Sequence, residues 1–205
     1  MLIIRPKKGN IGKIVKNTAE SIKQGKVIIF PTDTVYGLIC DATNKKSVQE
    51  LFKIKGRKKK KAVPIFVKDI AMAKKIVVIN KNQEKFLKKY WPGKVTAVLK
   101  TINKRQEIKI YGVDKKTIAL RVPGYKIIDA LFEKLNRPLT GTSANFSGKP
   151  ESTKIEDVIG QFWGRKLQPD LVIDIGNLKK SRPSTIIDLT THKIKILRQG
   201  EVKIR

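Results

Sequence analysis

The chain reads Pro31-Thr32-Asp33-Thr34-Val35-Tyr36-Gly37-Leu38 directly after the apolar run Val27-Ile28-Ile29-Phe30. Four consecutive apolar residues, most of them β-branched, predict a buried strand, and Pro31 ends it because proline has no amide hydrogen to donate. The following loop carries three hydroxyls and a carboxylate, and Gly37 permits a sharp turn. Loops at the carboxyl ends of strands bind ligands in open α/β sheets. By itself, this loop is either such a binding loop or a turn capped by its own hydroxyls.

Helical and strand patterns alternate along the rest of the chain. This interleaving predicts an α/β (α+β) fold, one domain over residues 1–205 with a twisted mixed β-sheet flanked by helices. We expect helices at 10–24, 82–90, 127–135 and 153–159, a short helix capped by Ser47 and a helical turn capped by Asp69. We expect strands at 27–30, 62–67, 94–101, 117–122, 171–175, 184–189 and 194–197, and an exposed hairpin or loop at 106–116.

Composition excludes several classes of protein. The 205 residues are 40% hydrophobic, which argues against disorder, and no apolar run approaches the roughly 20 residues that span a bilayer. Cys40 is the only cysteine, which excludes an internal disulfide and a multi-thiolate metal site. His192 is the only histidine, so a Ser-His-Asp triad has little to build on. The N-terminus is too short and too basic for a secretory signal. We therefore expect a cytoplasmic protein without a membrane segment.

The net charge of +29 is extreme, with 46 basic and 17 acidic residues. Such a surface attracts phosphate backbones. However, 37 of the basic residues are lysines spread along the chain, whereas arginine is preferred for bidentate phosphate recognition. Two explanations stay open: compositional drift of a solvated surface, and weak RNA or tRNA binding without sequence preference.

Three segments are rich in groups that bind phosphate. Lys55 and Arg57 stand two residues apart, so in an extended segment both would project to one side, although they also begin a solvated lysine run. Residues 140–148 combine hydroxyls, an amide and two glycines, which suits an oxyanion-binding loop and equally a plain turn. Arg121 ends one predicted strand and Arg198 follows another. Each of these signals is weak when taken alone.

Together these segments resemble the YrdC/TsaC-type threonylcarbamoyl-AMP synthase family. The resemblance covers residues 21–202 and rests on seven motifs in the family's order. The motifs are Pro31 to Leu38 (P-T-[DE]-T-V-Y-G-L), Lys55-Gly56-Arg57 (K-x-R), Trp91-Pro92-Gly93-Lys94-Val95-Thr96, Arg121-Val122-Pro123, Ser143-Ala144-Asn145-Phe146-Ser147-Gly148 (S-x-N and a small-residue turn), Ser184-Thr185-Ile186-Ile187-Asp188-Leu189, and Leu197-Arg198-Gln199-Gly200.

The chain departs from the family pattern near the K-x-R motif. Lys58 stands where the family often has proline. Lys61 and Phe66 are nearest to the Asn and His that some longer members carry, so it stays open which residues of this segment make those contacts. The chain ends soon after the last motif, and we therefore expect the short form without an extra C-terminal domain.

The resemblance implies a YrdC-like fold and an enzyme that forms L-threonylcarbamoyladenylate from L-threonine, bicarbonate (or CO2) and ATP, releasing pyrophosphate. The product serves t6A modification at adenosine 37 of tRNA through downstream tRNA threonylcarbamoyl-transferase proteins, and Mg²⁺ is expected with ATP. Several anionic groups meet in this reaction, so the site needs cations and hydrogen-bond donors but no protein nucleophile. The shortage of histidine and cysteine fits that chemistry.

The resemblance also assigns roles to individual residues. Arg121 suits a threonine carboxylate because its guanidinium offers a two-donor fork. The implied catalytic residues are Lys55, Arg57, Ser143 and Asn145; ATP is bound by these four with Thr117 and Arg198, threonine by Thr32, Thr34, Arg121, Gly141 and Ser184, and no metal by the protein itself.

Two other functions stay open. One is a non-catalytic module of the same fold that binds double-stranded RNA through a basic face. The other is a paralogue that adenylates a different carbamoyl compound. The intact K-x-R and S-x-N pairs favour the enzyme, because RNA binding alone would not require them at these places.

Overall fold

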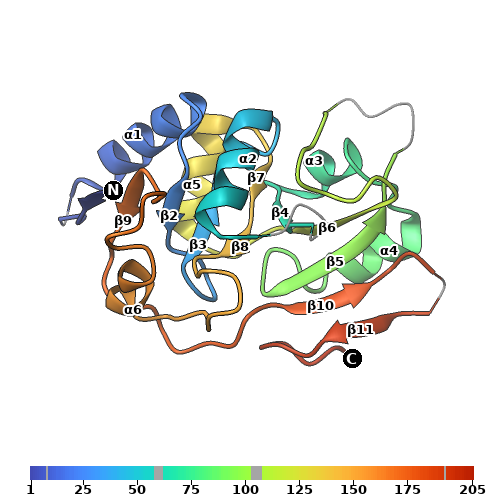
Figure 1. Ribbon diagram of the computed structural model, residues 1–205. Coiled ribbons are helices and arrows are strands. Elements are labelled where there is room, and N and C mark those ends of the chain that lie inside the picture. The colour runs from blue at the N-terminus through green and yellow to red at the C-terminus, as the bar shows by residue number, and fades with distance from the viewer. Residues whose placement is uncertain (8, 58–61, 103–107, 192) are drawn as a thin grey trace.

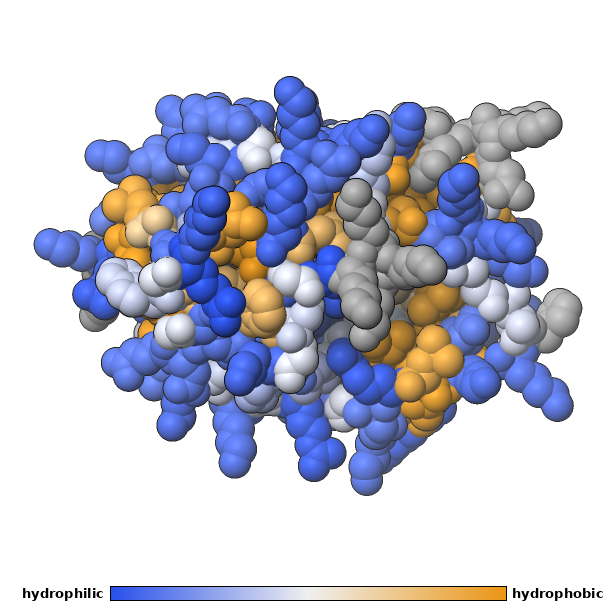
Figure 2. Space-filling view, in the orientation of Figure 1, coloured by the Kyte–Doolittle hydropathy of each residue, from blue (hydrophilic) through white to orange (hydrophobic). Residues whose placement is uncertain are grey.

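The computed structural model describes residues 1–7, 9–57, 62–102, 108–191 and 193–205. These residues form two mixed β-sheets with helices packed against them (Figure 1). The predicted mixed α/β architecture is confirmed, but the single predicted sheet is divided into two. In the same orientation, hydrophilic side chains cover most of the visible face, and apolar ones show between them (Figure 2).

The first sheet has five strands in the order β1-β9-β2-β3-β8. Strands β1, β9 and β2 are mutually parallel, whereas β3 runs antiparallel to both β2 and β8. The pairing of β2 with β3 returns the chain on itself, so residues 31–36 form the connection at one end of this sheet. The strands are β1 Leu2–Ile4, β9 Leu171–Ile173, β2 Ile28–Phe30, β3 Gly37–Ile39 and β8 Thr142–Ser143.

The second sheet has six strands in the order β11-β10-β5-β6-β4-β7. Parallel and antiparallel pairs alternate across it. Gly141 alone separates β7 from β8, so the chain passes from one sheet to the other at this glycine. The strands are β11 Lys195–Arg198, β10 Thr185–Asp188, β5 Val95–Lys100, β6 Thr117–Arg121, β4 Ile65–Phe66 and β7 Leu139–Thr140.

Two buried clusters hold the helices against the sheets. Alternate residues of β2 point to opposite faces, as expected for a strand: Ile28 and Phe30 join one cluster and Ile29 joins the other. The cluster around Ile28 contains the apolar faces of α1 and α5, which pack together on this side of the five-stranded sheet. The helices are α1 Ile11–Lys23, α2 Lys45–Ile54, α3 Ile70–Lys74, α4 Lys81–Leu87, α5 Lys126–Leu135 and α6 Ile155–Gly160.

The helix caps partly differ from the prediction. Asp69 caps α3 as predicted, because its Oδ1 accepts from the amide of Met72 at 2.7 Å. The prediction that Ser47 caps α2 is wrong: Asn44 caps it, accepting from two first-turn amides. Ser47 lies inside that turn, where its hydroxyl donates to the carbonyl of Gly25 at 2.8 Å.

Other differences concern short elements. The prediction did not include β1 and β3, and it treated the residues of β8 as part of a loop. The strand predicted at 62–67 is limited to the two residues of β4, and the helix predicted at 82–90 is α4, which ends at Leu87. Among the described residues, no helix is long and apolar enough to cross a membrane. The lysine run 58–61 and His192 lie outside the described residues.

Gly141 provides a test of the crossing between the sheets. A Cβ at this position would lie 2.4 Å from the Phe66 ring, so Gly141→Ala should lower the free energy of unfolding by about 1–3 kcal/mol. Gly12→Ala in α1 is the matched control: nothing lies within 4 Å of its Cβ, and the change should be neutral or slightly stabilising. Urea denaturation measures both effects, and equal stabilities of the two variants would contradict the close approach.

Candidate functional site

A cavity of about 350 Å³ lies between one face of the six-stranded sheet and the loop that connects β2 to β3. The strand register explains why these residues converge. Phe66 pairs with Arg121, Val98 with Ala119, and Ile186 with Arg198, so all six side chains lie on one face of the sheet. The motif loop contributes Thr32 and Thr34, and the start of the S-x-N segment contributes Thr142 and Ser143.

Lys55 is buried beneath the S-x-N segment, with a relative exposure of 2%. Its ammonium donates to the carbonyls of Ser143 (2.6 Å) and Asn145 (3.0 Å) and to Asn145 Oδ1 (2.8 Å). The Ser143 hydroxyl donates to the same Oδ1 at 2.6 Å, and the amide of Ser147 donates to the carbonyl of Lys55. All three hydrogens of the ammonium therefore hold the K-x-R turn to the S-x-N segment.

The expectation that Lys55 and Arg57 project side by side from an extended segment is wrong. Lys55 has helical backbone angles at the end of α2, and Gly56 follows in the left-handed region with φ +61°. This turn directs Lys55 inward, whereas Arg57 lines the cavity and donates to the carbonyl of Ala62 at 2.6 Å. Of the two cations, Arg57 is the one that lines the cavity.

Arg121 is held by the motif loop. Its guanidinium is buried; it donates to the carboxylate of Asp33, to the Thr34 hydroxyl (3.3 Å) and to the carbonyl of Gly93 (2.8 Å). The second oxygen of Asp33 accepts from the amide of Gly124 at 3.1 Å. Asp33 thus neutralises and orients Arg121, and guanidinium hydrogens remain for a ligand because arginine has five donors.

A third arginine, Arg198, reaches the cavity from β11, an edge strand of the six-stranded sheet. Arg198 donates through Nε and Nη2 to the carbonyl of Ser184, at 3.2 and 2.7 Å. The hydroxyl of Ser184 lies 2.8 Å from that of Thr96, and both side chains are buried. These bonds connect the edge strand β11 to the site.

The electrostatics of the cavity favour anions. Burial is the main cause that lowers the pKa of Arg57, Arg121 and Arg198, which nonetheless stay charged. Burial, followed by the charge of Arg57, lowers the pKa of Lys55 to about 7. Glu151 is the one carboxylate among the described lining residues.

Eight of the eleven residues predicted for the site line this cavity, and three do not. Lys55 and Asn145 lie behind Ser143 and support it. Thr117 shares the cavity face of β6 but pairs with Lys100 at the far end of that strand, away from the cavity. The eight lining residues are Thr32, Thr34, Arg57, Arg121, Gly141, Ser143, Ser184 and Arg198.

The sequence-based site omitted Asp33, Thr96 and Glu151. The position of Asp33 between two threonines of one loop was a usable signal, since a buried arginine requires a carboxylate partner. Thr96 depends on the register between β5 and β10, which the sequence does not show. No group of three or more His, Cys, Asp or Glu among the described residues is placed to hold a metal ion.

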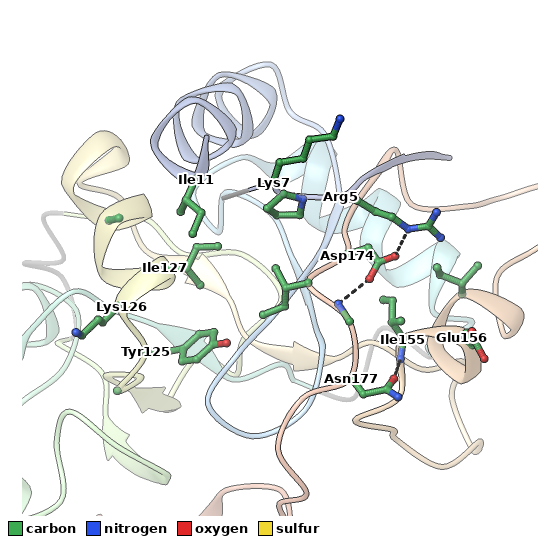
Figure 3. Close-up of a pocket in the computed structure, with 16 residues that line it drawn as sticks. Arg5, Lys7, Ile11, Tyr125, Lys126, Ile127, Ile155, Glu156, Asp174 and Asn177 are labelled. Carbon is green, nitrogen blue, oxygen red and sulfur yellow. Dashed lines mark hydrogen bonds and ion pairs between the residues drawn. The ribbon is translucent and has the colours of Figure 1, made fainter. Parts of the chain in front are cut away.

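A second and larger cavity, of about 1000 Å³, lies near the N-terminus (Figure 3). Its walls are mainly aliphatic and come from the start of α1, from α5 and from α6. Its buried carboxylate, Asp174, is already engaged by Arg5 at 2.8 Å and by the amide of Gly176 at 2.8 Å. Unlike those of the smaller cavity, the described residues that line it include no convergent set of arginines and hydroxyls. The smaller cavity is therefore the candidate functional site.

The fold and this cavity define an α/β protein with a small cavity lined by arginines and hydroxyls. Comparison with known proteins gives the family: the Sua5/YciO/YrdC family model, described as "Telomere recombination", matches residues 20–200. The chain belongs to this family.

Individual relatives extend this finding. A Vibrio vulnificus protein named threonylcarbamoyl-AMP synthase is 31% identical over 194 residues, covering 93% of this chain and 98% of the relative. The crystal structure of P. abyssi Sua5 complexed with L-threonine has a TM-score of 0.84 at 31% identity, covering 97% of this chain and 57% of that one. The crystal structure of E. coli YciO has a TM-score of 0.83 at 26% identity, covering 100% and 97%.

The pKa of Lys55 makes stability depend on pH. The pKa of Lys55 is about 7 in the folded chain, against an ordinary value of 10.5. At pH values between these two, the unfolded chain holds up to one more proton at Lys55 than the folded chain does. The free energy of unfolding of the unmodified protein, relative to Lys55→Met, should therefore rise from pH 7 to pH 10, by at most about 1.4 kcal/mol per pH unit. Lys53→Met, at an exposed position of the same helix, is the matched control. If the difference in the free energy of unfolding between the unmodified protein and Lys55→Met did not change with pH, the three acceptors would be holding Lys55 charged over this range.

Proposed function

We propose that the protein is a threonylcarbamoyl-AMP synthase, acting on L-threonine, bicarbonate (or CO2) and ATP. The observation that carries the proposal is the convergence of Arg57, Arg121 and Arg198 on one small cavity, beside the hydroxyls of the motif loop and the S-x-N segment. Relatives that carry this name, and a solved relative complexed with L-threonine, support the choice of substrates.

The proposed chemistry requires this distribution of charge. The amine of threonine and bicarbonate combine to an N-carboxylate with loss of water. A carboxylate oxygen then attacks the α-phosphorus of ATP, the bond between this phosphorus and the β-phosphate bridging oxygen breaks, and pyrophosphate leaves. Negative charge is concentrated on the transferring phosphoryl group and its neighbours, so fixed cations and donors lower the barrier.

We assign the phosphate side of the cavity to Arg57 and Ser143. Lys55 and Asn145 act mainly by holding Ser143 and the turn that carries Arg57, because their polar groups are bonded to each other. Arg198, which lines the cavity from the edge strand β11, is assigned to the nucleotide. Thr117 is not assigned a contact with ATP, because it lies outside the cavity.

We assign the threonine side to Arg121, with Thr32, Thr34, Gly141 and Ser184 around it. The bonds to Asp33, Thr34 and Gly93 fix the plane of the guanidinium. An oriented arginine binds a carboxylate through two parallel hydrogen bonds. Asp33 is accordingly part of the threonine site, although its carboxylate faces Arg121 and the amide of Gly124.

Magnesium enters this proposal with ATP. Mg²⁺ is usually held by phosphates and water with one or two carboxylates, and Glu151 is the one carboxylate that the described lining residues offer. One carboxylate does not form a protein cage, but it suits a Mg²⁺ ion that is bound mainly by the phosphates of ATP. Such an ion would offset part of the phosphate charge.

The product is a mixed anhydride that water hydrolyses, so it requires prompt transfer to an acceptor amine. We therefore propose tRNA threonylcarbamoyl-transferase proteins as downstream partners, in the cytoplasm. The non-catalytic RNA-binding alternative is less favoured, because it does not account for three arginines that line one cavity of this size.

Omission of substrates tests the proposed reaction. Pyrophosphate release from ATP should require both L-threonine and bicarbonate, and each should be omitted in turn from bicarbonate-depleted buffer. Serine in place of threonine measures the selectivity of the amino-acid pocket. Equal release without threonine would reject the proposal.

Arg121→Lys should raise the KM for threonine by about 10-fold or more, with a smaller effect on the KM for ATP. Lysine cannot keep the bonds to Asp33, Thr34 and Gly93 and still offer a planar fork. Arg137→Lys is a suitable control, since Arg137 is half-exposed and pairs with Asp41 away from the cavity. If only the KM for ATP changed, Arg121 would belong to the nucleotide side.

The charge of +29 predicts weak RNA binding that lacks sequence preference. Hydrophilic side chains are distributed over the visible face and are not gathered in one patch, as expected for such binding (Figure 2). Filter binding of a cognate and a non-cognate tRNA should give similar affinities that fall steeply between low and high salt, through counterion release. Selective binding that persists at high salt would instead indicate a surface adapted to recognise tRNA.

A further inference from the structure

The ring of Phe146 packs against the glycine at the centre of the K-x-R motif. A Cβ at Gly56 would lie 2.3 Å from Cζ and 2.6 Å from Cε2 of this ring. The ring therefore occupies the space that a side chain at Gly56 would need. Because Lys55 and Arg57 flank this glycine, the ring touches the turn from which both cations project.

The end of α6 holds Phe146 from the other side. Gln161, the residue that caps the C-terminus of α6, accepts from the amide of Phe146 through Oε1 and donates to the carbonyl of Pro150 through Nε2, both at 2.9 Å. Arg165 donates to the carbonyl of Gln161, and its guanidinium carbon lies 4.2 Å from the centroid of the Phe146 ring. We call Gln161, Phe146 and Arg165 the α6 clamp.

None of the three residues of the α6 clamp lines the cavity. Gln161 bridges the two ends of the loop 146–150, and the stacked guanidinium covers the outer face of the ring. The far end of the ring, around Cζ, then limits where the turn at Gly56 can lie. The clamp can therefore act on a ligand through the turn that carries Arg57.

We propose that Phe146 and Gln161 are positioning residues for the phosphate side of the site, acting through Arg57. The inference rests on the proposed function only in taking ATP as the ligand. It assigns a role to the C-terminal end of α6, which belongs to none of the family motifs in this sequence. Fixing a phosphate-binding arginine before the ligand arrives reduces the ordering that binding requires, and so strengthens binding.

Gln161→Ala removes the bridge without creating a buried cavity. The Kd for ATP, measured by isothermal titration calorimetry, should rise by roughly 3- to 10-fold, as expected for lost hydrogen bonds. The Kd for L-threonine should change by less than about 2-fold. Trp163→Ala is the matched control: Trp163 lies in the same turn but is 66% exposed and outside the clamp, so ATP affinity should be unchanged.

A double-mutant cycle separates positioning from a general structural effect. In an Arg57→Ala background, Gln161→Ala should have no further effect on the Kd for ATP, because the residue through which it acts is absent. A merely structural role would weaken ATP binding by the same factor in both backgrounds. Arg165→Ala, at an exposed position, is a second variant that should show the same coupling with a smaller effect.

Because the readout is ATP binding, its outcome is separate from that of the proposed reaction. Two results would overturn the inference even if turnover requires threonine and bicarbonate. One is an equal effect of Gln161→Ala on the Kd for ATP with and without Arg57, and the other is unchanged ATP affinity in both Gln161→Ala and Arg165→Ala. Coupling to Arg57 would support it even if another amino acid proved to be the substrate. Failure of the unmodified protein to bind ATP would overturn both proposals.

Discussion

The site depends on the three hydrogen bonds of the buried Lys55 ammonium. They join the end of α2 to Ser143 in β8 and to Asn145 just after it, 88 and 90 positions further along the chain. An ammonium removed from water is stable only when its hydrogens find acceptors, and two carbonyls and one amide oxygen provide them here. Removing these acceptors would leave a buried amino group without hydrogen-bond partners, so the two segments are held together. The position of Arg57 follows from that of Lys55, because only Gly56 lies between them.

The second constraint is repulsion among the cations. Arg57, Arg121 and Arg198 surround one cavity. Burial is the main cause that lowers the pKa of Arg121, and the charge of Arg198 lowers it further. The carboxylate of Asp33 offsets the free-energy cost of burying the charge of Arg121, whereas Arg198 donates to the backbone carbonyl of Ser184. A bound polyanion would relieve this repulsion. The arrangement is therefore that of a site whose charges are balanced only when its ligand is present.

The sequence predicted much of the fold, because the amphipathic helices near residues 10–24 and 127–135 and the longer strands have clear periodicity. It could not predict the division into two sheets, since β7 and β8 have two residues each and a single glycine between them carries no periodic signal. The motifs contain half of the residues that line the cavity. Their individual directions could not be read: Lys55 turns inward because of the left-handed Gly56, and Thr117 lies too far along its strand.

The most direct test of whether the arginine-lined cavity binds phosphate is isothermal titration calorimetry with inorganic pyrophosphate. The titration compares the unmodified protein, Arg57→Ala and Arg5→Ala at a salt concentration that suppresses binding to surface lysines. Arg5 is exposed and lies on the rim of the aliphatic cavity, so it controls for loss of one arginine. We expect one pyrophosphate per chain for the unmodified protein and for Arg5→Ala, and loss of this binding in Arg57→Ala. Equal binding by Arg57→Ala and Arg5→Ala would contradict this expectation, because the phosphate site would then lie outside the arginine-lined cavity.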